Sequence, residues 1–290
     1  MAINVNFKKI LSTAGIEYVK WVCNARMILL GVMILFMNSF IIQPLQDHAR
    51  KMSSPLNSLE PFIAAVNSEI LVIIVPVIFL ALFSDFPRTD GNTLFFIQRV
   101  GKVNWILGQI LFALYAIFTY VGSIFLGSVL PVISTSFWKN GWSLVITKYS
   151  SLYPNEANSF ACLLIKNNVY NQVSPWYAAV QGYALMMLYL LVLALIMLSF
   201  NCLGKKIYGM ISSACVIAFG GTICLVKMPL MWFFPMAHTS IWLHFTDYYR
   251  KPNMEMWVSY AYFIVSISIL LSVSIMTLKK LNFDSIQEID

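Results

Sequence analysis

Long runs of apolar residues dominate this chain and alternate with shorter polar connections. A helix that crosses a membrane needs about 20 mostly apolar residues. Six stretches approach or meet this length, the first as a short core that its flanking residues extend. We therefore predict transmembrane helices over residues 27–42, 62–83, 103–125, 176–200, 207–225 and 257–278. The pattern indicates an all-α polytopic membrane protein, with residues 1–290 forming a single transmembrane domain.

Polar and apolar positions interleave before the first of these helices. Residues 1–26 carry both lysines and aliphatic side chains, among them Val5, Lys8, Lys9, Ile10, Leu11, Ile16, Val19 and Lys20. This mixture favours a cytoplasmic amphipathic helix in the membrane interface, with its lysines toward anionic headgroups. The alternative is a basic tail.

Two connections on the opposite side are long and aromatic. The loop at 131–175 contains Trp138, Trp142 and Tyr149, and this composition favours an ordered external structure over disorder. The segment 229–250 is nearly as apolar as the spans, but Pro229 and Pro235 interrupt it. We predict a re-entrant helical hairpin there, since broken helices at membrane depth must be buried in protein or line a cavity. An aromatic belt at the headgroups is the alternative.

Composition supports a membrane protein and excludes several other classes. The chain is 59% hydrophobic and 11% charged, whereas soluble domains carry about 25% charged residues. The net charge of +7 is spread along the chain, so it does not indicate nucleic-acid binding. The five cysteines are scattered and predict neither a disulfide framework nor a metal site.

The distribution of Lys and Arg predicts the orientation. With the N-terminus inside, eleven of them fall in cytoplasmic segments and eight in longer external loops, which count less. Both termini are then cytoplasmic, and residues 279–290 form a cytoplasmic tail. The late start of the first apolar core argues against a cleaved signal peptide.

Catalytic motifs are missing from the sequence. It contains no HExxH zinc motif, no GxSxG elbow and no P-loop, so we expect no enzyme activity, no catalytic residue, no metal and no cofactor in this chain. Glu69 is the one acid inside a predicted span, where such residues are functional candidates. Together with four residues of the 229–250 segment, it forms our candidate substrate path: Glu69, Trp232, Phe233, Phe234 and His238.

The polar connection at 84–102 is the most informative segment. Gly91, Asn92 and Thr93 can start a short helix, with Asn92 or Thr93 as its cap. Leu94, Phe95 and Ile97 would then offer apolar anchors to a groove on a partner. Charged residues on both sides would fix the orientation of that partner, namely Asp85, Arg88, Asp90 and Arg99. The alternative is an amphipathic helix that rests on lipid.

These residues also carry a family resemblance. Six spans, an interfacial first helix and a broken apolar hairpin before the last span resemble the ABC-2 type permease, the membrane subunit of type V ABC exporters. In that family an acid ends the second span, a Gly-Thr-Leu coupling helix follows, and a basic residue precedes the third span. The matching positions are Asp85, Gly91, Thr93, Leu94 and Arg99, and Gly108 matches the glycine of the family's third span. The sequence departs from the pattern at Val100, where proline is usual, and at Gln109, where lysine is common.

The resemblance implies a function and partners. ATP and Mg would bind to two copies of a separate ABC ATPase, coupled through Asp85, Arg88, Asp90, Gly91, Thr93, Leu94, Phe95 and Arg99. A second permease, as a homodimer or a heterodimer, would complete an exporter in a bacterial cell membrane. Similarity to bacteriocin and phenol-soluble modulin exporters implies an amphipathic peptide substrate. Alternatives are a drug, antibiotic or lipid efflux permease, a stand-alone secondary transporter, or a non-transport membrane protein.

Overall fold

The computed structural model describes residues 5–88, 93–247 and 251–277. Within these ranges all regular elements are helical, apart from two isolated β-bridges. Five helices are long and apolar enough to cross a membrane, or six if one bent pair is taken as a single span. The predicted all-helical membrane architecture is therefore confirmed at this level.

The bundle has one long helical segment that exceeds its prediction. It consists of η1 (Ala25–Met27), α2 (Ile28–Met37), the π-helical η2 (Asn38–Ile42) and α3 (Gln43–Lys51). We expected the first span to end at residue 42, but the helix continues to Lys51. The π turn ends at Ile42, two residues before Pro44, which has no N–H to donate to the preceding turn.

The second predicted span, 62–83, is not one continuous helix. The structure divides it into α4 (Glu60–Asn67) and α5 (Leu71–Leu82), which meet at a bend of 77°. Ser68 has extended backbone angles and ends α4. The Asn67 side chain then accepts a hydrogen bond from the backbone N–H of Ile241 at 3.1 Å, a bond to another part of the chain.

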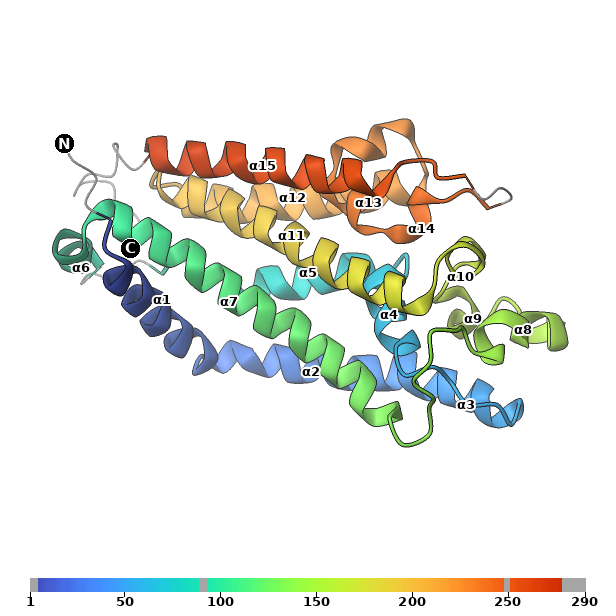
Figure 1. The fold of residues 1–290 in the computed structure, drawn as a ribbon. Coiled ribbons are helices and arrows are strands. Elements are labelled where there is room, and N and C mark those ends of the chain that lie inside the picture. Colours follow the sequence, from blue (N-terminus) through green and yellow to red (C-terminus); the bar gives the residue numbers. More distant parts are fainter. Residues whose placement is uncertain (1–4, 89–92, 248–250, 278–290) are drawn as a thin grey trace.

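The remaining long helices agree with their predicted ranges to within a few residues. They are α7 (Lys102–Val129), continued by η3 (Leu130–Val132), α11 (Pro175–Asn201), α12 (Lys206–Leu225) and α15 (Met256–Thr277). Figure 1 shows α11 in the middle of the bundle, where it packs against α7, α12 and α15. It is also the most buried of the long helices.

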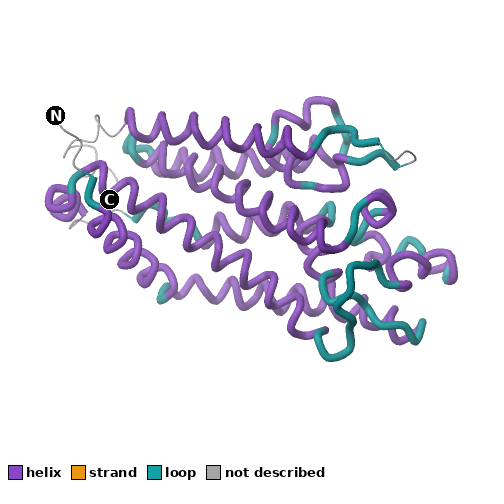
Figure 2. The backbone as a smooth tube through the Cα atoms, viewed as in Figure 1, coloured by secondary structure: helices purple, strands orange, loops and turns teal. Residues whose placement is uncertain are grey.

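Short helices gather at the two ends of the bundle. At one end lies α6 (Thr93–Val100), beside the start of α1 (Phe7–Val22). At the other end, which we call the cap end, lie α8 (Leu144–Leu152), η4 (Pro154–Glu156), α9 (Phe160–Leu163), α10 (Asn167–Gln172), η5 (Pro229–Phe233), α13 (Pro235–Thr239) and α14 (Ile241–His244). Most loops lie at this end too (Figure 2).

The cap-end helices include the predicted external loop at 131–175 and the predicted hairpin at 229–250. The 131–175 loop contains helices, as we expected for an ordered region. The predicted hairpin at 229–250 is a series of three short helical segments, and its residues 248–250 lie outside the described part of the chain.

The predicted amphipathic helix forms α1, but it has two distinct faces. One face, with Ile10, Thr13 and Ala14 buried, packs along the first half of α7. The approach is close because Gly108 of α7 has no side chain, and a Cβ there would lie 2.7 Å from Thr13. The opposite face exposes Ile16 and Val19, which remain available to lipid. Placement of α1 in the membrane interface stays a prediction.

Candidate functional site

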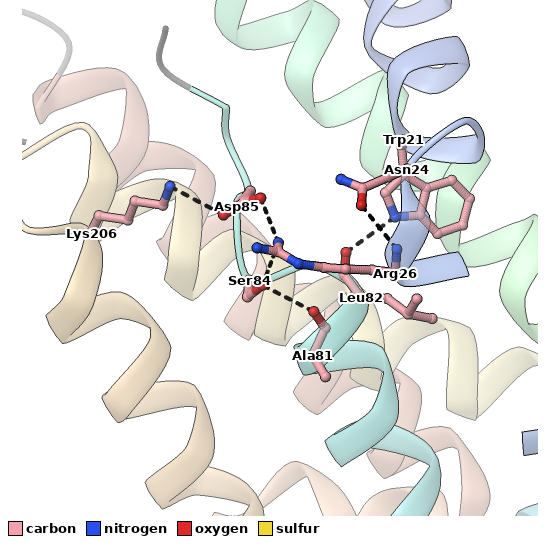
Figure 3. Close-up of polar contacts among 8 residues, drawn as sticks. All are labelled: Trp21, Asn24, Arg26, Ala81, Leu82, Ser84, Asp85 and Lys206. Atoms are coloured by element: carbon pink, nitrogen blue, oxygen red, sulfur yellow. Dashed lines mark hydrogen bonds and ion pairs between the residues drawn. The ribbon is translucent and has the colours of Figure 1, made fainter. Parts of the chain in front are cut away.

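A charged cluster ties together three connections at the α6 end of the bundle (Figure 3). Arg26 comes from η1, Asp85 follows α5, and Lys206 begins α12. The Arg26 guanidinium donates to Ser84 Oγ at 2.7 Å and also pairs with one carboxylate oxygen of Asp85. The ammonium of Lys206 lies 3.7 Å from the other carboxylate oxygen. Asp85, the acid that we expected to end the second span, therefore joins two other parts of the chain.

Hydrogen bonds at the end of α5 hold this cluster in place. The last carbonyls of a helix have no partner within it, so other groups must satisfy them. Here the indole N–H of Trp21 donates to the carbonyl of Leu82 at 3.3 Å, and Ser84 Oγ donates to that of Ala81 at 3.0 Å. Asn24 caps η1 by accepting from the Arg26 N–H at 3.0 Å. The junction between α1 and η1 is thus fixed against the end of α5.

Aromatic rings form the floor below the charges. Phe83 stacks on Phe112 with centroids 5.5 Å apart, and Phe86 lies 4.8 Å from Phe83. Trp21 meets Phe83 edge-on at 6.1 Å. The cavity between this floor and the charges holds about 40 Å³, enough for a water molecule but not for an organic ligand. Arg88 lines the same cavity. The cluster is therefore suited to a contact surface and not to a small-molecule pocket.

The charges of the cluster remain in contact with solvent. The side chains of Arg26 and Asp85 are 40% and 43% exposed. Ion pairs with this exposure contribute about 0–1 kcal/mol to folding. The cluster therefore sets the relative position of the three connections more than it stabilises the fold.

Helix α6 exposes two of its predicted contact residues and buries a third. Phe95 is 69% exposed and Arg99 is exposed, so both side chains are accessible at the surface. Ile97, however, is buried, so its prediction as a partner anchor is wrong. It packs with the core because α6 folds back on the start of α7 through Gly101, whose φ of 94° favours glycine.

Helix α6 is also connected to α1. The Lys9 ammonium donates to the carbonyl of Arg99 at 3.1 Å, which links α1 to the end of this helix. Thr93 is its first residue. Asp90, Gly91, Asn92 and the side chain of Leu94 lie outside the described part of the structure.

The five residues of the candidate substrate path do not form one group. Glu69 lies at the bend between α4 and α5, where its carboxylate pairs with the Lys166 ammonium at 3.1 Å. Phe233 is 75% exposed, and Phe234 packs against α12 near Gly220. Only Trp232 and His238 come together, with ring centroids 5.5 Å apart.

Sequence reasoning missed the most buried acid among the described residues. Glu60 begins α4 and is fully buried, because its carboxylate accepts from the backbone N–H groups of Ser143 at 2.7 Å and Asn57 at 3.0 Å. It lay just outside the predicted span. Its spacing from Asn57 was the available signal, since a polar cap followed three residues later by Glu is typical of a helix start.

Comparisons with known proteins add no relative. No family model matches the chain, and neither does any curated protein or solved structure. The fold and the cluster define an all-helical protein with helices long and apolar enough to cross a membrane, and the ion pairs of its described part lie toward the two ends of the bundle.

Proposed function

We propose that this chain is the membrane subunit of an ATP-driven exporter of the ABC-2 type, coupled to separate ATPase subunits through α6. The observation that carries this proposal is the position of α6: a short helix at one end of the bundle, with Phe95 exposed and its preceding loop anchored by Asp85. An exposed aromatic side chain beside charged residues is a typical docking surface for a protein partner.

The ion pairs around Asp85 offer a route for movement. Through Arg26 the loop before α6 is connected to the α1–η1 junction and the long helix that starts there. Through Lys206 it is connected to the start of α12. When ATP closes the ATPases, a pull on α6 would act on both helices. ATP drives this change only if the ATPases bind it more tightly in the closed state.

The uncovered apolar faces fit a paired permease. In α15 only 17% of the apolar window is buried within the chain, and in α12 33%. Lipid and a second copy of this chain would share these faces in the proposed homodimer.

The apolar and Met-rich character of the spans, with 15 Met in the chain, suits an adaptable amphipathic substrate. Our preferred substrate is therefore an amphipathic peptide of the toxin or bacteriocin type, with drug, antibiotic or lipid efflux as alternatives.

Co-purification tests the coupling role of α6. The chain is expressed with a P-loop ATPase from a neighbouring reading frame, as wild type and as the variant Phe95→Ala with Arg99→Ala. We expect the variant to lose most of the bound ATPase. The matched control is Phe118→Ala, because Phe118 is also an exposed aromatic residue, 61% against 69% for Phe95, but lies within α7. Equal ATPase binding by wild type and variant, or no ATPase bound to either, contradicts the proposal.

Substitution of Asp85 separates coupling from folding. Asp85→Asn removes the charge but keeps the shape, so we expect thermal stability to change by less than about 1 kcal/mol. ATPase binding should persist, whereas ATP-dependent transport in proteoliposomes should fall.

A separate experiment identifies the substrate class. ATPase activity of the wild-type complex is measured with panels of peptides, lipids and drugs, and a flat response to peptides removes our preferred substrate.

A further inference from the structure

Two histidines and a serine form a closed polar cluster at the cap end. His238 is in α13, His244 is the last residue of α14, and Ser259 is in the first turn of α15. His238 is 2% exposed, and the other two are fully buried. Ser259 Oγ lies 2.9 Å from His238 Nδ1 and 2.7 Å from His244 Nε2.

The far nitrogen of each ring faces a backbone carbonyl. His238 Nε2 lies 2.8 Å from the carbonyl oxygen of Trp232, and His244 Nδ1 lies 3.0 Å from that of Ser240. A carbonyl can only accept, so each of these contacts requires an N–H on the ring. The cluster is therefore a chain of four short contacts, from carbonyl to imidazole to hydroxyl to imidazole to carbonyl.

Counting hydrogens shows that the neutral cluster is incomplete. Four contacts of hydrogen-bond length need four hydrogens. A neutral imidazole supplies one hydrogen and the serine hydroxyl supplies one, so two neutral rings and Ser259 supply three. A change of tautomer only moves the gap to another contact. One additional proton, which makes one ring an imidazolium, completes all four hydrogen bonds.

The surroundings are suited to such a cation. Trp232 lies 5.5 Å from the His238 ring and 5.4 Å from the His244 ring, and Tyr262 of α15 stacks on His238 at 4.1 Å. An aromatic face within about 6 Å attracts a cation, and the stacked Tyr262 ring presents its face to His238. These rings and the hydrogen bonds offset part of the cost of burying the charge.

Other titratable groups lie on α11, α12 and the segments that flank α15. Tyr189 of α11 and Cys224 of α12 are buried. Asp247 pairs with Lys227 at 3.9 Å at the surface, and Glu255 at the start of α15 is exposed. Burial opposes the charge and lowers the pKa of both imidazoles, that of His244 to about 4. Proton uptake is thus expected below the ordinary histidine value of 6.5.

We propose that His238, Ser259 and His244 form a buried site for a single proton, which fastens the 229–244 segment to α15 when it is bound. The proton comes from the aqueous phase, and an N–H bond is the only covalent bond that forms. The site rests on the cluster alone and does not depend on the proposed export function.

Nitrogen NMR of the whole chain tests the site directly. The chain has three histidines, and His48 serves as an internal reference. At pH 8 we expect two neutral rings. During acidification the pair takes up one proton, and one ring remains neutral after the other has become an imidazolium. The proposal is overturned if neither ring is protonated down to pH 4, or if both become imidazolium together.

The variant Ser259→Ala removes the bridge between the rings, and its matched control is Ser272→Ala, whose hydroxyl bonds only within α15. We expect the pair in Ser259→Ala to take up its proton at least one pH unit lower, and the control to behave as wild type. Equal titration of all three proteins contradicts the proposal. If Ser259→Ala does not fold, the wild-type titration still decides.

Amide hydrogen exchange measures whether the bound proton stabilises the packing of residues 229–244 against α15. After correction for the pH dependence of chemical exchange, amides of residues 229–244 should exchange about tenfold more slowly in the protonated wild type. Ser259→Ala should show no such slowing. Unchanged exchange across the titration contradicts the fastening role.

Discussion

At the α6 end of the bundle, Arg26, Asp85 and Lys206 meet with their charges partly in solvent, whereas at the cap end Glu60 and the two histidines are buried. Solvent screens the first group, so its pairs can separate and re-form at little cost. In the second group every lost hydrogen bond leaves a buried polar atom without a partner. The comparison predicts that contacts at the α6 end rearrange at a lower free-energy cost than the buried contacts at the cap end.

Removal of the buried carboxylate should have the largest effect. Glu60→Ala leaves the N–H groups of Ser143 and Asn57 without acceptors, and we expect a loss of roughly 2–6 kcal/mol, at about 1–3 kcal/mol for each donor. Unfolding in mixed detergent measures this loss. Glu60→Gln keeps one acceptor and should lie in between. Glu69→Ala is the control, because its carboxylate is 32% exposed and should cost less than about 1 kcal/mol. Similar losses for Glu60→Ala and Glu69→Ala would show that buried polar groups contribute no more stability than exposed ion pairs, and would contradict the basis of the comparison.

Steric fit, and not charge, should account for the stability of the α6 end. Gly108→Ala places a Cβ 2.7 Å from Thr13, so α1 must move away from α7, and we expect a loss of about 1–3 kcal/mol. Thr13→Gly should restore part of it in the double variant. The control Gly31→Ala meets no atom within 4 Å, so it should leave stability unchanged or raise it slightly. A neutral Gly108→Ala would show that the contact between α1 and α7 is loose.

An exposed ion pair at the cap end should have the smallest effect. Hydrogen bonds from Lys51 and then from Tyr149 lower the pKa of Glu156 below its ordinary value of 4.5. A lowered carboxyl pKa stabilises the fold above the unfolded value, and this contribution is lost as the pH falls through the folded one. The melting temperature of wild type should therefore fall slightly more than that of Glu156→Gln on acidification below about pH 5. Parallel curves for the two proteins would exclude this contribution.

The sequence predicted the long helices well because an apolar run of membrane length has few other solutions in a chain with so little charge. It predicted the limits of the first two spans less well. The extension to Lys51 is polar and carries no apolar run, and the polar residues from Asn67 to Glu69 signal a break only when their partners in distant segments are known.

The candidate sites likewise combine features that the local sequence predicts with contacts that depend on distant parts of the chain. Asp85 was identified from its place after a span, but its partners Arg26 and Lys206 are 59 and 121 positions away along the chain. The burial of Ile97 depends on the fold-back at Gly101 and could not be read from periodicity over one short helix. His244 and Ser259 are separated by a loop, so their contact required the tertiary structure.

The helical segment from Ala25 to Lys51 has one further consequence. With 27 residues and a rise of about 1.5 Å each, it is about 40 Å long, some 10 Å more than the hydrocarbon core of a bilayer. Arg26 at one end holds Asp85, and Lys51 at the other holds Glu156 at 2.7 Å. In the proposed membrane arrangement, the segment would connect polar contacts on the two sides of the bilayer. A change in bilayer thickness that alters its tilt would be felt at both ends at once.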